Sequence, residues 1–498
     1  MNVNDFKELA KQGYNRIPVY RQLLIDDETP VSSYHKLAQG AYSFLFESVH
    51  GGERWGRYSI IGLPCSSRIE IKGHDITRIE NHQIVEQLTR TDPLSIIDEY
   101  QAQFNVPEID ALPDFFGGLV GYFGYDCVRY SEPRLKEALN DPNGLNDVVL
   151  MLAEDVLIFD NLAGVLHCVT LTDPSKEHAY EHAQTRLDDI MTSLHTSTQR
   201  LDAINLSANN APAQDSEQQF ESSFGEDAFK QAVDTVKNYI LAGDCMQVVL
   251  SQRLSLAFEH DPYTLYRVLR HLNPSPYMYY VNLGDTQIVG ASPEVLVRID
   301  DTDRVTVRPL AGTRRRGQTQ ADDELLEQEL LSDPKERAEH LMLIDLGRND
   351  IGRIAQTGSV HVTERYVVER YAHVMHISSN VEGRLASNYS ALDALRSILP
   401  AGTLSGAPKV RAMEIIDELE PVKRGVYGGA IGYLAWNGEM DTAIAIRTAV
   451  IHKGTLHLQA GAGIVADSDP QKEWDETMNK ARGMFKAIDL LNQHSELN

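Results

Sequence analysis

Cysteine is scarce in this chain of 498 residues. The four cysteines, Cys65, Cys127, Cys168 and Cys245, lie far apart in the sequence. They form no Cys-x-x-Cys pair and no Cys/His cluster, which argues against a zinc site and against a disulfide framework. Cysteine usage of this kind is typical of a reducing compartment, so we expect a cytoplasmic protein.

Long apolar runs are also missing. No stretch of roughly 18 consecutive apolar residues occurs, so the sequence predicts no membrane-spanning helix. The opening residues, MNVNDFKELAKQGYN, are polar and of mixed charge, unlike a secretory signal peptide. No GxGxxG or Walker A motif follows a predicted strand, which argues against nucleotide binding.

Positive charge is outnumbered by negative charge. The chain has 46 Lys and Arg residues against 72 Asp and Glu residues, a formal net charge of −26. Nucleic acid and anionic membranes are poor partners for such a surface. An anionic substrate would therefore need a local positive patch or a metal ion. The run Arg314 to Arg316 and the isolated Arg447 are candidates for that patch, although they could equally be a solvated loop and a surface charge.

A polar segment divides the chain. Residues 196–223 contain few large apolar side chains and predict a linker. It separates an N-terminal region, 1–195, from a region at 224–491 in which hairpins alternate with helices. The last third of that region predicts a three-stranded meander over 427–436, 440–452 and 455–465. This mixture, without a regular βαβ rhythm, predicts an α+β fold with mostly antiparallel sheets.

Two predicted helices begin with carboxylates spaced three residues apart, namely Glu336 with Glu339 and Glu473 with Glu476. Met342, Leu343 and Leu346 place Glu339 on an apolar helix face, where a carboxylate needs a proton, a cation or a metal ion. Oxygen ligands from two helices suit Mg²⁺ better than Zn²⁺. The alternative is ordinary, because acidic residues favour the first turn of any helix.

Several other positions could meet an anion. The glycines of Gly461 to Gly463 follow a predicted strand and could present backbone N–H groups, or could form a plain bulge. Gly312 and Thr313 form a similar loop. Arg447 lies in a predicted strand on a face of small residues, where it needs an anionic partner from the protein or a substrate. His376 follows apolar residues and could be a core histidine or a catalyst.

Together these segments resemble the chorismate-utilising enzymes, most closely their anthranilate-forming branch. The similarity runs from about Phe44 to Ala487 and is densest from Cys245 onward. It implies that the antiparallel sheets form a sandwich with helices packed outside. The motifs that carry it are NPSPYM at 273–278, ASPE at 291–294, PLAGTRRRG at 309–317, EHLMLIDLGRND at 339–350, VMH at 374–376, LSGAPK at 404–409, RGVYGGAIGY at 424–433, IRT at 446–448 and GAGIVADSDPQKEWDETMNKA at 461–481.

The resemblance implies a magnesium site and a chorismate site. Glu339 and Glu476 would bind Mg²⁺, with Glu336 and Glu473 nearby or bound through water. The ion would hold the ring carboxylate of chorismate, which the backbone of Gly461, Ala462 and Gly463 would also support. The remaining implied roles are a pocket lining by Gly312 and Thr313, contacts to the enolpyruvyl carboxylate by Tyr427 and Arg447, acid/base chemistry at the departing ring hydroxyl by His376, and positive charge beside the metal from Lys480.

Two positions bear on which reaction the resemblance implies. Relatives that add water carry a lysine base where this chain has Gln247, so ammonia is the expected nucleophile. Relatives that make 4-amino-4-deoxychorismate usually carry lysine where this chain has Ala311, so amination at C2 is expected, followed by loss of pyruvate. Neutral drift would explain either residue. The expected reaction is therefore chorismate plus ammonia to anthranilate and pyruvate, the first step of tryptophan biosynthesis.

A partner and an inhibitor are also implied. No cysteine has a glutaminase-like setting, so a separate glutamine amidotransferase subunit would supply ammonia. The family's regulatory Leu-Leu-Glu-Ser motif reads Leu45 to Ser48 here, with Phe46 in place of leucine; Leu310 likewise replaces the usual isoleucine in PIAGT. Feedback by tryptophan would involve Ser48, Pro276, Tyr277 and Met278.

Two alternatives remain beside this expectation. The first is an aminodeoxychorismate synthase component. The second is a catalytically silent protein that binds tryptophan, against which the presence of Glu339, Glu476, His376 and Arg447 argues.

Overall fold

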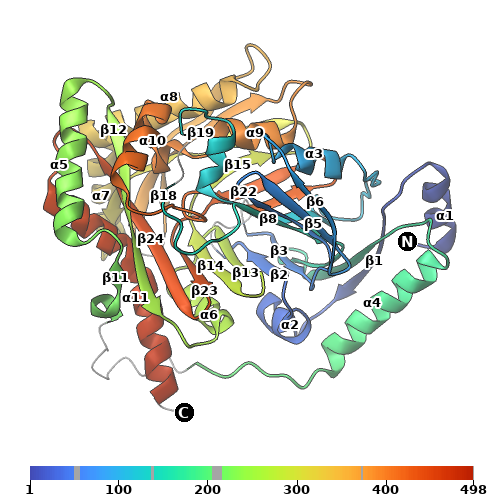
Figure 1. Cartoon of the computed structure of the whole chain (residues 1–498). Helices are drawn as coiled ribbons and strands as arrows, with labels where there is room; N and C mark the ends of the chain where they lie inside the picture. Colours follow the sequence, from blue (N-terminus) through green and yellow to red (C-terminus); the bar gives the residue numbers. More distant parts are fainter. Residues whose placement is uncertain (50–55, 136–138, 205–215, 372–373, 497–498) are drawn as a thin grey trace.

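Two large antiparallel sheets organise the computed structural model, which describes residues 1–49, 56–135, 139–204, 216–371 and 374–496 (Figure 1). Each sheet has 12 strands in the described part of the chain, and every pairing is antiparallel. The predicted α+β fold with mostly antiparallel sheets is confirmed.

The first sheet has the following order: β1 (Ile17–Leu24), β10 (Val165–Thr172), β9 (Asp155–Asp160), β3 (Tyr58–Gly62), β2 (Ser43–Glu47), β13 (Tyr277–Asn282), β14 (Thr286–Ser292), β23 (Thr448–His452), β24 (Thr455–Ile464), β12 (Gln247–Ala257) and β11 (Glu221–Ser222), with β20 (Gly406–Ala407) also paired to β12.

The second sheet has the following order: β17 (Leu310–Arg315), β19 (Val374–Arg384), β16 (Arg304–Val307), β15 (Val295–Ile299), β22 (Met440–Ile444), β21 (Ala430–Ala435), β7 (Gly118–Phe123), β8 (Val148–Ala153), β4 (Arg68–Lys72), β5 (Asp75–Glu80) and β6 (Gln83–Thr89), with β18 (His361–Arg370) also paired to β19.

A shared apolar core joins the two sheets face to face. Phe44, Ile158 and Tyr279 of the first sheet belong to one buried cluster with Tyr122 and Ile431 of the second. Two further clusters lie on the outer faces and bring helices onto them. The first sheet is covered by α2 (Pro30–Leu37), α4 (Ala179–Thr196), α6 (Pro262–Leu272) and α11 (Pro470–Glu496), and the second by α3 (Ser95–Gln101), α8 (Pro334–Gly352) and α9 (Ala391–Ile398). The sandwich with helices outside is therefore observed.

The two predicted regions, 1–195 and 224–491, are interleaved in space. Strand β2 pairs with β13 in the first sheet, and β7 pairs with β21 in the second. Each sheet thus contains strands from both regions. Part of the predicted linker, 205–215, lies outside the described residues, while β11 at its end joins the first sheet as an edge strand.

The chain crosses between the sheets at two places that concern the site. Strand β14 belongs to the first sheet and β15 to the second, so Pro293 and Glu294 lie at one crossing. Strand β22 belongs to the second sheet and β23 to the first, so residues 445–447 form the other. The predicted meander over 427–465 is therefore wrong as one sheet. It is two hairpins, β21–β22 and β23–β24, one in each layer.

Helix α8 begins as its sequence predicts. The Asp333 carboxylate accepts hydrogen bonds from the backbone N–H groups of Lys335 and Glu336, and Pro334 takes the first helical position. Leu343 and Gly347 are buried against the sheet, and the α-carbon of Gly347 lies so close to Val307 that an added Cβ would be only 3.0 Å from it. This packing fixes which face of α8 points into the sandwich.

No helix in the described ranges has the length and apolar character needed to cross a membrane.

Candidate functional site

A cavity of about 210 Å³ lies where the two crossings, α8, α11 and β24 meet. Most of the site residues predicted from the sequence line it, although they come from distant parts of the chain. These residues are Gln247, Ala311, Gly312, Thr313, Glu339, His376, Tyr427, Arg447, Gly461, Gly463, Glu476 and Lys480. Ala462, Glu336 and Glu473 do not line it.

The glycines of β24 give the cavity a wall of backbone. A Cβ on Gly461 would lie 2.9 Å from the Tyr427 hydroxyl and 3.0 Å from the Leu250 carbonyl oxygen, so only glycine fits. Lys480 donates a hydrogen bond of 2.8 Å to the Gly461 carbonyl. The N–H and C=O of one strand residue point to the same side, so the Gly461 N–H also faces away from β12.

Ala462 differs from its glycine neighbours. It is opposite Leu250 in the β24–β12 ladder, and its side chain is buried in the core beneath α5 (Glu226–Ala242) and α10 (Lys409–Leu419). By the same alternation its backbone polar groups point to β12. The predicted support of a carboxylate by the Ala462 backbone finds no basis in this geometry.

Two carboxylates form the acidic wall of the cavity. Glu339 on α8 is half-buried and accepts a 3.0 Å hydrogen bond from the Gln247 side-chain nitrogen. Burial raises the pKa of Glu339, and the nearby charges of Glu336 and Glu476 raise it further. Glu476 on α11 forms a 2.8 Å ion pair with Lys480. Burial and neighbouring carboxylates both disfavour the ionised form of a carboxyl group, so a negative charge on Glu339 would be stabilised by a bound cation.

These donors fit Mg²⁺. Magnesium usually takes one or two protein carboxylates and keeps several waters or substrate oxygens as its other ligands. Glu339 and Glu476 supply two carboxylates across one cavity. The structure gathers no group of three or more His, Cys, Asp or Glu side chains that could hold a metal ion within the residues it describes.

Glu336 and Glu473 have other local partners. Glu336 forms a 3.1 Å ion pair with Arg314 and supports the start of α8. Burial raises the pKa of Glu473, which a hydrogen bond from Ser468 opposes. The predicted basic run is likewise occupied, because Arg314 also binds Asp333 and Arg316 binds Asp323. The proposed local positive patch therefore rests on Arg447 and not on Arg314 to Arg316.

Arg447 has an unusual position. It lies between β22 and β23 and not within a strand, with a left-handed backbone φ of 50°. In the described part of the chain, its guanidinium has no hydrogen bond or ion pair to a protein group. Burial lowers its pKa, and Tyr371 and Glu294 oppose that shift. A half-buried arginine that has no hydrogen bond or ion pair among the described residues and is held in a left-handed backbone conformation is well suited to an anionic ligand.

His376 on β19 has a defined tautomer. Its Nδ1 is 2.9 Å from the Gly312 carbonyl oxygen and 3.1 Å from the Thr313 hydroxyl. A carbonyl only accepts, so Nδ1 carries the proton and Nε2 keeps its lone pair. Burial lowers the His376 pKa to about 4, with a further contribution from the charge of Arg447. His376 is therefore neutral near pH 7 and can accept a proton at Nε2, which favours the base half of the acid/base role that the resemblance implies.

Glu294 is a functional candidate that the sequence reasoning missed. It lies at the crossing between β14 and β15 and lines the same cavity. Burial raises its pKa to about 8, although hydrogen bonds from the Thr403 hydroxyl at 3.1 Å and the Leu310 N–H at 3.4 Å oppose the shift. Glu294 therefore holds a proton near pH 7. The feature in the sequence that points to Glu294 is an acidic residue inside the otherwise apolar run ASPEVLV.

A second cavity of about 290 Å³ lies between β2, β13 and β21. Ser48, Pro276, Tyr277 and Met278, the residues predicted to contact tryptophan, all line it, and so does the variant position Phe46. Its charged lining has both signs and comprises Glu47, Arg57, Asp114, Arg298 and Asp441. The Tyr277 hydroxyl donates a 2.8 Å hydrogen bond to Asp441. Apolar and aromatic walls with paired charges suit a zwitterion that carries an apolar ring.

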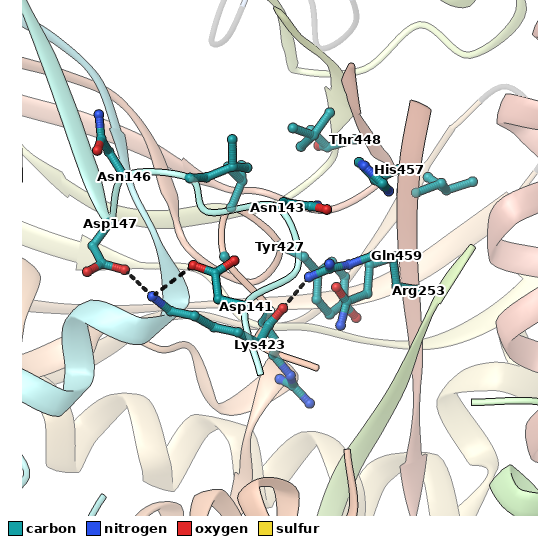
Figure 2. Close-up of a pocket in the computed structure, with 16 residues that line it drawn as sticks. Asp141, Asn143, Asn146, Asp147, Arg253, Lys423, Tyr427, Thr448, His457 and Gln459 are labelled. Carbon is teal, nitrogen blue, oxygen red and sulfur yellow. Dashed lines mark hydrogen bonds and ion pairs between the residues drawn. The ribbon is translucent and has the colours of Figure 1, made fainter. Parts of the chain in front are cut away.

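A third, small cavity borders the first one (Figure 2). Figure 2 shows Lys423 reaching between Asp147, at 2.5 Å, and Asp141, at 4.0 Å. Tyr427 and Gln459 line both this cavity and the first. Its volume of about 30 Å³ leaves room for about one water. We interpret it as a paired charge network that supports the wall of the first cavity.

Known proteins give a consistent comparison. Residues 44–486 match the family described as chorismate binding enzyme. Anthranilate synthase component 1 of Pseudomonas aeruginosa is 57% identical, and that of Aquifex aeolicus 46% identical, with 100% of this chain and 100% of each relative covered.

Solved structures add to this. Anthranilate synthase component I from Streptococcus pneumoniae TIGR4 has a TM-score of 0.77 and 38% identity, covering 93% of this chain and 99% of that one. The menaquinone-specific isochorismate synthase MenF from Escherichia coli has a TM-score of 0.70 at 20% identity, covering 98% of both chains, and shows the fold alone.

Proposed function

This chain belongs to the family of chorismate binding enzymes, and on that premise we propose that it converts chorismate and ammonia into anthranilate, pyruvate and water in tryptophan biosynthesis. The observation that carries the proposal is the first cavity. Its lining includes a half-buried arginine with no hydrogen bond or ion pair among the described residues, two carboxylates, a neutral histidine and a protonated glutamic acid.

Chorismate has two carboxylates, and the cavity offers a place for each. Arg447 and the Tyr427 hydroxyl bind the enolpyruvyl carboxylate, for which the planar guanidinium is geometrically suited. At the other end, the Gly461 N–H and Lys480 face the ring carboxylate. Glu339 and Glu476 would hold Mg²⁺, which when bound supplies positive charge to neutralise that carboxylate. A dianion can thereby enter a protein of net charge −26.

The acid and base follow from the protonation states. Ammonia attacks C2, both conjugated ring double bonds shift to C1=C6 and C4=C5, and the C4 hydroxyl leaves as water with a proton from Glu294. The new ammonium group on C2 then loses a proton, which restores the protonated form of Glu294. The Nε2 of His376 then accepts the proton on C2 as the C3–O bond breaks. The enolpyruvyl group takes up a proton and leaves as pyruvate, and the ring becomes aromatic. Glu294 and His376 have pKa values on opposite sides of 7, which separates the donor from the acceptor.

Two lining residues favour this reaction over its relatives. The side-chain N–H of Gln247 donates a hydrogen bond to Glu339, and the side chain has no basic group to activate water. Ala311 has no nucleophilic side chain that could attach to the ring. Both positions support ammonia as nucleophile and C2 as its target.

The ammonia source and the regulation complete the proposal. The relatives are named component 1, which supports a partner component, and we assign it as a glutamine amidotransferase subunit. The second cavity, with Ser48 and the Pro276 to Met278 segment in its wall, is the proposed site of inhibition by tryptophan. A pull-down from cells that express the tagged chain should recover a protein with glutaminase activity, and recovery of none would remove the partner assignment.

Product analysis tests the reaction itself. The purified chain is incubated with chorismate, an ammonium salt and Mg²⁺ at alkaline pH, and products are separated by chromatography. Anthranilate and pyruvate in equal amounts are expected. Exclusive formation of 4-amino-4-deoxychorismate would contradict the Ala311 argument. The absence of any product, with tryptophan still bound, would support the silent regulatory alternative.

A further inference from the structure

A row of three residues links the second cavity to Arg447. Tyr279 on β13, Gly290 on β14 and Thr448 on β23 are in register across the first sheet. Tyr279 lines the second cavity. A Cβ on Gly290 would lie 2.1 Å from the Tyr279 ring, so the ring lies over this glycine and passes across β14. The glycine thus allows the Tyr279 hydroxyl to reach a strand that is not its neighbour.

The hydrogen bonds at the end of this row have a defined direction. The Thr448 hydroxyl donates to the Ile446 carbonyl at 2.7 Å. Its single hydrogen is then used, so the Tyr279 hydroxyl, 2.6 Å away, is the donor in the Tyr279–Thr448 bond. Both groups are buried, where such bonds are not exchanged for bonds to water.

Thr448 holds the segment that presents Arg447. Its bond to Ile446 spans Arg447, whose backbone is in the left-handed region with φ 50°. The Arg447 carbonyl also accepts from the Ala291 N–H at 3.3 Å. A strained backbone conformation persists only where neighbouring groups impose it. At Arg447 the Thr448–Ile446 and Ala291–Arg447 hydrogen bonds do so. A shift of Thr448 therefore changes where the Arg447 guanidinium lies.

We propose that Tyr279 is a positioning residue for Arg447, acting through Thr448, and that a ligand in the second cavity alters chorismate binding through this hydrogen bond. The inference rests on the proposed function for its substrate and for tryptophan as the ligand. Tryptophan in the cavity meets the Tyr279 ring directly. Displacement of that ring weakens the bond to Thr448 and releases the turn at Arg447, so the affinity for chorismate falls.

The test uses Tyr279→Phe in the full-length chain. Phenylalanine keeps the ring in the cavity wall, and the Thr448 hydroxyl still donates to Ile446, so no buried donor loses its partner. The KM for chorismate should rise about fivefold, the effect of one neutral hydrogen bond, while kcat stays within about twofold. The Kd for tryptophan, from calorimetry without chorismate, should change by less than about threefold. The further rise in chorismate KM that tryptophan causes should shrink markedly.

Two comparisons separate positioning from general damage. Tyr280→Phe alters the next residue of β13, whose ring packs on the opposite face with Tyr34 and Tyr263, and should change neither KM nor inhibition. Thr448→Ser keeps the hydroxyl and should behave like the unaltered chain, whereas Thr448→Val loses the bonds to both Tyr279 and Ile446 and should raise the chorismate KM at least as much as Tyr279→Phe. In the double variant Tyr279→Phe/Thr448→Val the two KM effects should not add.

Three results would overturn the inference. The first is an unchanged chorismate KM in Tyr279→Phe together with full inhibition. The second is a parallel loss of tryptophan binding and inhibition, which would make Tyr279 a ligand contact only. The third is a fall in kcat without a change in KM. If the unaltered chain makes no anthranilate, the proposed function fails and this inference fails with it. If it makes anthranilate but binds no tryptophan, only the regulatory half fails, and the KM comparison decides the positioning half.

Discussion

The two large cavities contain similar numbers of charged groups but use them differently. In the second cavity the Tyr277 hydroxyl donates a hydrogen bond to Asp441. The positive charge of Arg298 is balanced by the same carboxylate, which lies beside it. In the first, the Arg447 side chain has no hydrogen bond or ion pair within the part of the chain that the structure describes, and Glu339 lies near the carboxylates of Glu336 and Glu476. The second cavity therefore has Asp441 paired within the protein, while the Arg447 guanidinium in the first is available to an anionic ligand and the Glu339 carboxylate to a cation.

Protonation separates the cavities as well. The first holds one group shifted above neutral pH, Glu294, and one shifted below it, His376. Such opposed shifts are typical of groups that exchange protons with a substrate. The second cavity pairs its charges and is lined by aromatic rings, which is sufficient for recognition. This difference supports the proposal that the first cavity carries out the chemistry and that the second one binds the inhibitor.

The largest expected effect is the loss of the acidic wall. Glu339→Gln removes one of two proposed Mg²⁺ ligands, and kcat should fall about 10²–10³-fold, the scale of losing one electrostatic contribution to the transition state. Tryptophan binding at the second cavity should be unchanged. Initial rates over a range of Mg²⁺ concentrations, with calorimetry for tryptophan, measure both. Near-normal turnover would remove Glu339 as a ligand.

Glu294→Gln tests the acid. Glutamine keeps the shape and the hydrogen bonds but has no acidic proton, so kcat should fall about 10²-fold or more, within the usual range for a general acid. The KM for chorismate should change little. Equal losses in kcat and in thermal stability would indicate a structural role for Glu294 instead.

Arg447→Met tests the unpaired cation. Methionine keeps much of the side-chain volume without charge, so chorismate KM should rise about 10- to 100-fold, as expected for a charged hydrogen-bonded contact. Because no described residue forms a hydrogen bond or ion pair with the Arg447 side chain, the melting temperature should stay the same or rise. A large loss of stability would show that the arginine has a structural partner.

The pH profile should show Glu294 directly. Its raised pKa means that the protonated, donating form predominates below about pH 8 and is lost as the pH rises through that value. At a constant concentration of free ammonia, kcat/KM for chorismate, which reports the pKa values of the free enzyme, should therefore fall about tenfold for each pH unit above 8. His376, with a pKa of about 4, should remain a base across this range. A flat profile up to pH 10 would exclude Glu294 as the donor.

The smallest effect on basal activity is expected at the second cavity. Ser48→Arg places a long cation in its wall, so inhibition by tryptophan should weaken at least about tenfold while kcat and chorismate KM stay within about twofold. Rates with increasing tryptophan give the inhibition constant. An unchanged constant would place the inhibitor elsewhere, and a large loss of basal rate would blur the division between the two cavities.

Local features of the fold were predictable from the sequence. Asp333 and Pro334 are local signals for the start of α8, and Gly438 and Gly454 are local signals for the turns of two hairpins. These features depend on neighbouring residues. The interleaving of β2 with β13 and of β7 with β21 depends on pairings across more than 200 positions, which no local pattern encodes.

The site was predictable in membership but not in protonation. The motifs identified Glu339, Arg447 and His376, and the structure brings all three to one cavity. The sequence predicted a continuous strand through Arg447, whereas the structure has a crossing between the sheets there. The left-handed φ of Arg447 is imposed by hydrogen bonds of Thr448 and Ala291, which the local sequence does not reveal. The tautomer of His376 and the proton of Glu294 depend on burial and on partners from other strands, so they required the structure.

The central claim is that the first cavity makes anthranilate and that the second one controls its access to chorismate. The most direct measurement is the initial rate of fluorescent anthranilate formation by the purified chain, with ammonium and Mg²⁺, over a grid of chorismate and tryptophan concentrations. We expect anthranilate as the product and an apparent KM for chorismate that rises as the tryptophan concentration rises. A product other than anthranilate, or a chorismate KM that does not respond to tryptophan, would contradict it.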